Sequence, residues 1–343
     1  MINVQGLTCE AATLNYKKKF GIKIISPHRT YYLACEDETE QEHWIKEINN
    51  SSLRNSDYRL HVVDADQSED ATFHDIQKAI DMAKDGDHIV LRSGVYKVPD
   101  TIVIKKPVTI RGVYPDHTLV SICSADNSKP ILRVDNFNEN LTLQQIEKQK
   151  LSEGGGFVKF EHLTLTQNAS KDSIVFYEAV SCLEVVSGKC SVDHVNICAA
   201  HGCGISVKNR MYSKSLPATT SGNESPVPGK KPSHEPTQVI ITDCYIQENK
   251  IHGVKFDDNA VGEITKCIIQ KNDGYGLLCL GESEVVIQRS VLSHHSKNAI
   301  MLDSSKTISI IGNKLQANGQ GGKNHISQSE KSAPCASEKN EFL

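Results

Sequence analysis

Residues 239–259, VIITDCYIQENKIHGVKFDDN, are followed by three segments of the same pattern: EITKCIIQKNDGYGLLCLGES (263–283), VVIQRSVLSHHSKNAIMLDSS (285–305) and ISIIGNKLQANGQGG (308–322). Aligned, they form columns with a period of 23 residues: Asp243, Lys266, Arg289, Gly312; Cys244, Cys267, Ser290, Asn313; and Ile246, Ile269, Leu292, Leu315. Apolar residues alternate with polar ones in short runs broken by Asn, Asp and Gly, which is typical of strands and not of helices. Such a repeat can bury its apolar face only by stacking on the next one, so the pattern predicts a solenoid of β-coils.

The repeat extends towards the amino terminus. Residues 190–209, CSVDHVNICAAHGCGISVKN, match the first segment, but Val195 and Cys244 are 49 residues apart, one period plus 26. The surplus coincides with residues 211–236, which are rich in Pro, Ser, Thr and Gly, so we expect an inserted disordered loop. Residues 157–169, FVKFEHLTLTQNA, form an earlier coil, and the polar residues 136–156 before it are a second insertion.

Residues 71–112, ATFHDIQKAIDMAKDGDHIVLRSGVYKVPDTIVIKKPVTIRG, precede the coils. Thr72 and Asp75 can cap a helix, and Gly86 suits the position after its end. The apolar face of this helix is expected to contain Phe73, Ile76, Ala79, Ile80 and Ala83. Three β-branched runs follow, and we predict strands at His88–Leu91, Thr101–Ile104 and Val108–Ile110.

A capping helix followed by coils of about 23 residues resembles the right-handed parallel β-helix of the pectin-lyase-like superfamily. Residues 86–112 are most similar to a group of repeats found in carbohydrate-binding proteins and sugar hydrolases, in bacterial copper-maturation periplasmic proteins and in eukaryotic F-box and Shc-binding proteins. The resemblance covers residues 59–322. It implies an all-β fold, a right-handed parallel β-helix with an N-terminal capping helix.

The opening stretch has a different pattern. Residues 20–25 and 30–35 alternate as the two strands of a hairpin, Thr39 and Glu42 form a capping box, and a helix follows with the apolar stripe Trp44, Ile45 and Ile48. PHRTYYLACEDETEQEHWIKEI (27–48) closely resembles the carboxy-terminal end of a pleckstrin-homology (PH) domain, in which Trp44 would be the almost universal tryptophan of the last helix.

The PH resemblance covers about residues 7–50 and lacks the first strands, which carry the basic residues of phosphoinositide-binding members. Binding of a phosphoinositide membrane is therefore expected only through the missing half, and Lys17, Lys18 and Lys19 are expected to form a solvated turn. The predicted organisation is a truncated PH domain (1–50), a linker (51–58), the β-helix (59–322) with insertions near 136–156 and 211–236, and a disordered tail (323–343).

The composition narrows the class of protein and its expected partners. The 343 residues are 38% hydrophobic and 23% charged, and the net charge is −4, with 38 Lys and Arg against 42 Asp and Glu. Without a basic excess, nucleic acid is not an expected partner. No apolar run approaches the roughly 18 residues of a membrane-spanning helix. Eleven cysteines without a C-x-x-C pair indicate buried free thiols in a reducing compartment, so we expect a cytoplasmic protein.

The sequence contains only incomplete motifs for four kinds of chemistry. The Asp-centred motif GNVDFIFG of pectin methylesterases is absent. His201 lies in a segment similar to the histidine motif of polygalacturonases, but Asp257 and Asp258 come after it instead of before it. Asp243, Lys266 and Arg289 form a column that would suit a polysaccharide lyase and equally a solvated ladder. Cys198, His201 and Cys203 lack a fourth zinc ligand, and strand alternation would place them on different faces.

We therefore assign no catalytic, cofactor-binding or metal-binding residues and no cofactor. The expected function is that of a non-catalytic intracellular adaptor, in which a PH-type module is joined to a β-helix that presents a binding surface to a protein partner or a glycan. The alternative is a carbohydrate-active enzyme, a polysaccharide lyase or glycoside hydrolase, on the same fold. A carboxylate cluster on one outer face of the β-helix would favour the enzyme.

Overall fold

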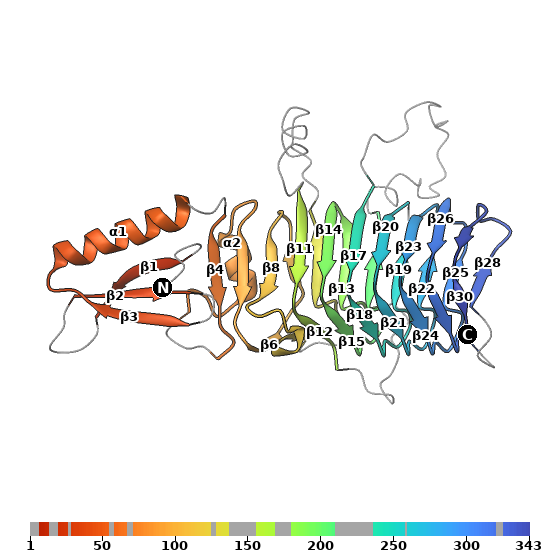
Figure 1. The fold of residues 1–343 in the computed structure, drawn as a ribbon, viewed down its shortest axis with the longest axis horizontal. Coiled ribbons are helices and arrows are strands. Elements are labelled where there is room, and N and C mark those ends of the chain that lie inside the picture. The colour runs from red at the N-terminus through yellow and green to blue at the C-terminus, as the bar shows by residue number, and fades with distance from the viewer. Residues whose placement is uncertain are drawn as a thin grey trace, which may run out of the picture. The chain divides into compact units, whose positions relative to one another are not determined.

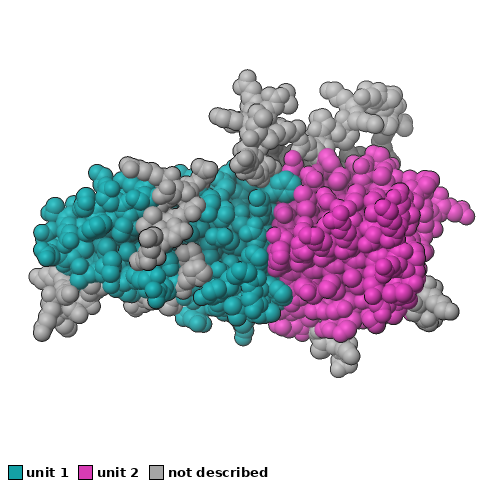
Figure 2. Space-filling view, in the orientation of Figure 1, with its two compact units in different colours: residues 1–97, 106–122, 142–164 teal, residues 98–105, 123–141, 165–343 magenta. Residues whose placement is uncertain are grey.

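The computed structural model describes residues 7–13, 20–26, 29–54, 58–66, 71–124, 128–136, 156–168, 180–209, 236–257, 259–319 and 325–343 (Figure 1). The chain forms two compact units, residues 1–97, 106–122 and 142–164 in the first and residues 98–105, 123–141 and 165–343 in the second (Figure 2). The predicted lysine turn at 17–19 and most of both insertions, near 136–156 and 211–236, lie outside the described residues. No helix in the described ranges is long and apolar enough to cross a membrane.

The first unit opens with a small antiparallel sheet. Its strands are β1 (Thr8–Ala12), β2 (Gly21–Ile25) and β3 (Thr30–Ala34), with β2 in the centre, and helix α1 (Glu38–Arg54) follows. The register pairs Ile22 with Leu33, which confirms the predicted hairpin. Ile22 and Ile24 are buried in a small core, against which Ile45 and Ile48 of α1 pack.

The predicted capping box of α1 is wrong by two residues. The helix begins at Glu38, because Asp37 Oδ1 accepts a 2.8 Å hydrogen bond from the backbone N–H of Glu40. Glu40 in turn accepts a 2.7 Å bond from the backbone N–H of Glu36. Asp37 and Glu40 have the same spacing as Thr39 and Glu42, and the earlier pair satisfies the helix N-terminus first.

Trp44 lies outside this core. Its side chain is 46% exposed, and its indole Nε1 donates a 3.3 Å hydrogen bond to Glu40 Oε1. Ile45 and Ile48 therefore carry the packing that the sequence also assigned to Trp44. Part of the apolar surface of α1 is therefore left in contact with solvent.

We expect the Trp44→Phe substitution to change the free energy of unfolding by less than about 0.5 kcal/mol, because exposed side chains contribute little. Ile48→Ala should lower it by about 1 kcal/mol or more, because Ile48 packs against the core. Urea unfolding of both variants checks this. Trp44 is the only tryptophan, so the emission of a buried indole, or a larger loss for Trp44→Phe, would contradict the structure.

The first unit continues with the beginning of the β-helix. Helix α2 (Ile76–Met82) is capped by Asp75, whose side chain accepts from the N–H of Lys78 at 3.2 Å, as predicted. The helix starts later than expected, because Phe73 forms a bridge with Val63 instead of a first turn. A parallel sheet has the order β4–β5–β8–β11, with strands at Leu60–Val63, His88–Leu91, Thr109–Gly112 and Phe157–Glu161. β6 (Gly94–Val98), β9 (Val120–Ser124) and β12 (Thr164–Thr166) are neighbours in another sheet, and η1 is a short 3-10 helix (His117–Leu119).

The second unit consists of three parallel sheets. The first has the order β7–β10–β13–β16–β19–β22–β25–β28, at Ile102–Ile104, Leu132–Asp135, Leu183–Ser187, Ile205–Val207, Val254–Phe256, Leu277–Cys279, Ile300–Leu302 and Ile326–Gln328. The second has the order β14–β17–β20–β23–β26–β29, at Lys189–Asp193, Gln238–Thr242, Val261–Thr265, Glu284–Gln288, Thr307–Ile311 and Ala336–Glu338. The third has the order β15–β18–β21–β24–β27–β30, at Asn196–Cys198, Tyr245–Gln247, Ile268–Gln270, Val291–Ser293, Lys314–Gln316 and Glu341–Phe342.

These sheets form a right-handed parallel β-helix, and Figure 1 shows its strands stacked coil upon coil. The predicted 23-residue register is confirmed, since Ile246 pairs with Ile269 and Ile269 with Leu292. Val195 lies beside Cys244, because the N–H of Tyr245 bonds the carbonyl oxygen of Val195 at 3.0 Å. The 49-residue interval therefore does contain one coil and an insertion.

Two columns of polar residues stack inside the coils. Cys244 and Cys267 are buried in adjacent rungs of one column, as predicted. The column continues with Ser290 and Asn313, whose side-chain oxygens accept from the backbone N–H of the preceding rung at 3.1 and 2.8 Å. The second column contains Asn249, Asn272, His295 and Asn318, again 23 residues apart. Both columns satisfy backbone groups where the chain turns between sheets.

The predicted disordered tail is wrong. Residues 326–343 form a further coil, in which β28, β29 and β30 pair with β25, β26 and β27. Asn340 extends the first polar column, because its side-chain oxygen accepts a 2.8 Å bond from the N–H of Asn313. The interval from Asn313 to Asn340 is 27 residues, so a search at a period of 23 residues misses this coil.

Candidate functional site

The outer corner between the second and third sheets of the second unit is the most structured functional candidate. Each coil turns there through one residue of positive φ: 52° at His194, 50° at Asp243, 55° at Lys266 and 52° at Arg289. These four residues are named here the corner column. A left-handed backbone is unfavourable for most side chains, although Asp and His tolerate it better than most. Because every coil repeats the same turn, the side chains leave the corner at the strand spacing of about 4.8 Å.

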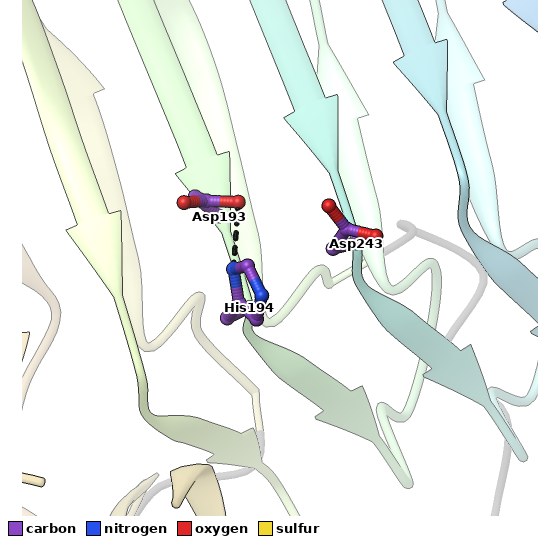
Figure 3. Close-up of side chains that lie close together, drawn as sticks. All are labelled: Asp193, His194 and Asp243. Atoms are coloured by element: carbon purple, nitrogen blue, oxygen red, sulfur yellow. Dashed lines mark hydrogen bonds and ion pairs between the residues drawn. The ribbon is translucent and has the colours of Figure 1, made fainter. Parts of the chain in front are cut away.

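Two carboxylates and an imidazole meet at one end of the corner column. Asp193 is the last residue of β14, His194 follows it, and Asp243 occupies the corner of the next coil (Figure 3). His194 Nδ1 lies 2.9 Å from Asp193 Oδ1. One donor atom from each of the three residues lies within 4.8 Å of the others. The side chains are 50% exposed for His194, 39% for Asp193 and 32% for Asp243, so solvent reaches the group.

Cations follow in the next two coils. Lys266 Nζ lies 3.8 Å from Asp243 Oδ2. Arg289 is exposed, and the described part of the chain offers it no ion-pair partner within 4.0 Å. The structure therefore confirms that Asp243, Lys266 and Arg289 lie at equivalent corners and form a column of unlike charges. Its Asp243–Lys266 pair is loose and half-exposed, which makes it worth little to stability.

Beside the corner column, the third sheet presents an apolar row and an amide row to solvent. The apolar row consists of Tyr245, Ile268 and Val291, which are in register on β18, β21 and β24. Tyr245 is 42% exposed. The amide row begins with Gln247 and Gln270, whose Nε2 donates to Gln247 Oε1 at 2.8 Å, and it resumes at Gln316 after the buried Ser293. Lys314 of β27 continues the apolar row as a partly exposed cation.

Of the candidates for glycosidase chemistry, the structure describes His201 and Asp257. His201 is 6% exposed, and its backbone N–H bonds Gln167 Oε1 at 2.8 Å. A Cβ added to the adjacent Gly202 would lie 2.4 Å from the carbonyl oxygen of Val180, so the chain is tightly packed at this corner. Asp257 is engaged by Lys255 at 2.9 Å. Asp258 lies outside the described residues.

The residues considered for zinc also separate as expected. Cys203 is buried, whereas Cys198 lies on an outward position of β15 and is partly exposed. All eleven cysteines are free thiols, and eight of them are buried. Burial raises the pKa of Cys203 to about 11. Such a thiol is neither a ready nucleophile nor a ready metal ligand at neutral pH.

The repeat in the sequence indicates Asp243, Lys266 and Arg289 but not Asp193 and His194. The alignment of Val195 with Cys244 already contained the signal, because it places His194 directly over Asp243. Asp193 then falls at the outward end of the preceding strand. The insertion separates the two coils by 49 residues in sequence, which hides their proximity.

Comparison with known proteins supports the fold. The family model described as the right-handed β-helix region matches residues 178–333. The pectin methylesterase PemA from Erwinia chrysanthemi is 12% identical, with 80% of this chain and 81% of that chain covered and a TM-score of 0.50. A pectin methylesterase from carrot is 11% identical, with 82% of each chain covered and a TM-score of 0.50. No curated protein matches the sequence. At these identities the structural likeness shows the pectin-lyase-like fold alone.

Proposed function

We propose that the β-helix is a non-catalytic binding module for an acidic glycan, and that its binding surface is the corner column with the apolar and amide rows beside it. The observation that carries the proposal is the register of Tyr245, Ile268 and Val291, which aligns three outward apolar side chains on consecutive coils. Tyr245 is exposed and Ile268 and Val291 are partly exposed, and a partly exposed apolar row flanked by polar groups suits a binding surface.

Each part of this surface suits one feature of an acidic sugar. The apolar row offers contact to the carbon face of a pyranose ring, as aromatic and aliphatic side chains do in ligand sites. The amide row supplies donors and acceptors for hydroxyl groups. Arg289 and Lys314 supply positive charge for sugar carboxylates, and the guanidinium can bind a carboxylate with two hydrogen bonds.

We also propose that β1–β3 and α1 are the carboxy-terminal part of a PH domain and that the chain acts as a cytoplasmic adaptor. The order of two paired strands followed by a helix with a tryptophan supports this. The free state of the cysteines suits a reducing compartment. A protein partner on the same outer face is the other ligand class for such an adaptor. We favour the glycan because the two solved structures described above, from Erwinia chrysanthemi and carrot, are named as pectin methylesterases.

The second candidate is a carbohydrate-active enzyme, which the fold comparisons favour as a class. The specific observation is the pair of carboxylates Asp193 and Asp243 on an outer face, next to Lys266. Lyase and hydrolase mechanisms use such groups for acid–base work or for a bound cation. Against it, the catalytic motifs of pectin methylesterases and polygalacturonases are not found in the sequence.

A glycan array with pectic and other uronic acid oligosaccharides tests the binding proposal. Wild type should bind acidic members, and Tyr245→Ala and Arg289→Ala should each weaken binding by about tenfold, the equivalent of about 1.4 kcal/mol. Val286→Ala is the matched control, because Val286 is 38% exposed on β23 of the neighbouring sheet. Equal binding by all four proteins, or no binding of any acidic glycan, would refute this surface as the site.

A further inference from the structure

Asp193, His194 and Asp243 bring three metal-ligating side chains together on the outer surface of two neighbouring coils (Figure 3). Adjacency in the sequence explains only one of the contacts, in which His194 Nδ1 lies 2.9 Å from Asp193 Oδ1. Asp243 joins them from the next coil, because the N–H of His194 bonds the carbonyl oxygen of Thr242, the residue before Asp243, at 3.2 Å. The proximity is therefore imposed by the β-helix.

The backbone holds the side chains in this arrangement. His194 and Asp243 have nearly the same left-handed φ, 52° and 50°, at equivalent corners. Their Cα–Cβ bonds are consequently almost parallel, and their spacing is that of adjacent strands, about 4.8 Å. Asp193 ends β14 beside this corner. Two coils thus supply a fixed framework for three short, exposed side chains.

From this geometry we propose that Asp193, His194 and Asp243 form a binding site for a divalent transition metal such as Zn²⁺, Ni²⁺ or Co²⁺. One imidazole nitrogen and two carboxylate oxygens are a donor set that these metals accept at about 2.0–2.2 Å. Ca²⁺ and Mg²⁺ prefer a shell of oxygens and gain nothing from an imidazole. The donor atoms lie within 4.8 Å of one another, and rotation of these partly exposed side chains can bring them closer. The exposed side leaves room for water or a ligand carboxylate.

The positive charge of Lys266 opposes metal binding, so the affinity for a metal should respond to substitutions at this position. Its ammonium lies 3.8 Å from Asp243 Oδ2, so a cation already occupies part of the space around that carboxylate. A divalent ion must displace or approach this charge, which costs free energy. Removing the positive charge at position 266 should therefore strengthen metal binding, whereas a surface ion pair without a site function would show no such response.

The test is a titration of the full chain with Co²⁺ alone, followed by absorption spectroscopy and calorimetry. Wild type should bind one Co²⁺ without the thiolate charge-transfer bands that the cysteines would produce. His194→Asn and Asp243→Asn should each weaken binding by about tenfold or more, and asparagine suits both left-handed corners. Lys266→Gln should bind several times more tightly than wild type.

Matched controls separate the site from other ligands. Glu248→Gln changes an exposed carboxylate that pairs with Lys271 at 3.8 Å in the next corner of the coil, and it should leave Co²⁺ affinity unchanged. Absence of Co²⁺ binding in wild type, or wild-type affinity in both asparagine variants, would overturn the proposal. The probe is the metal alone, so this result is independent of glycan binding and leaves the proposed function to its own experiment.

Discussion

Replacing Asn272 by leucine is expected to lower the free energy of unfolding by about 4 kcal/mol. Asn272 is fully buried, and its Oδ1 accepts from the backbone N–H of Asn249 at 3.1 Å and from Asn249 Nδ2 at 2.8 Å. Leucine has a similar volume but no acceptor, so two buried donors lose their partner. Each such loss costs about 1–3 kcal/mol.

Gln270→Leu is the matched control for this prediction. Gln270 is an amide in the same coil, two residues before Asn272, but it lies on the outer face in the amide row. Its substitution should change stability by less than about 0.5 kcal/mol, because water replaces the lost hydrogen bond. Urea unfolding measures both variants. Similar losses at the two positions would mean that the interior column does not hold the coils together.

Acid should destabilise the β-helix between pH 6.5 and about 4, and His295 should carry about 3 kcal/mol of the loss. His295 is 2% exposed, and burial lowers its pKa to about 4 from the ordinary value of 6.5. Within that window the unfolded chain binds a proton that the folded chain excludes, so stability falls as pH falls. The contribution is fully present above pH 6.5 and fully lost below pH 4.

The structure shows why the proton is excluded. His295 Nδ1 faces the backbone N–H of Asn272 at 3.3 Å and must accept from it, which places the ring proton on Nε2. Nε2 is buried without a hydrogen-bond partner among the described residues, and it is packed against Gly276, where an added Cβ would come within 2.5 Å of it. Protonation of Nδ1 would break the contact with Asn272.

His295→Asn isolates this effect, because the other members of the column at 249, 272 and 318 are already asparagine. The variant should be at least as stable as wild type at pH 7 and should lose about 3 kcal/mol less on acidification to pH 4. Burial also lowers the pKa of His252 to about 4, so part of the acid sensitivity remains. Unfolding curves across pH check the difference, and superimposable acid profiles of the two proteins would contradict it.

The β-helix was predictable because each repeat of the sequence forms one coil, so equivalent residues of successive repeats lie side by side. A 23-residue period in the sequence becomes one coil, so Cys244 over Cys267 follows from counting once the strand pattern is recognised. Strand β5 coincides with the predicted His88–Leu91. The last coil was missed because its interval of 27 residues breaks the count. The cap of α1 was misplaced because two residue pairs satisfy the same spacing rule.

The candidate site was only half predictable. Sequence alone showed the column of Asp243, Lys266 and Arg289, because these residues share the period. Recognising Asp193 and His194 as site residues requires knowing which side chains face outward at the corner. Their direction depends on the left-handed φ of His194. Local composition does not encode that angle, because the packing of neighbouring coils decides the backbone conformation at most such corners.

The most direct test of the central claim is mass spectrometry of an acidic oligosaccharide recovered after incubation with the full chain, combined with its co-elution on size exclusion. We predict that the oligosaccharide co-elutes with wild type, that Tyr245→Ala reduces the co-eluting amount in line with its roughly tenfold weaker binding, and that the recovered mass is unchanged. Shortened, unsaturated or de-esterified products would contradict the non-catalytic proposal and establish the enzyme. Failure of wild type to retain any acidic oligosaccharide would contradict glycan binding itself.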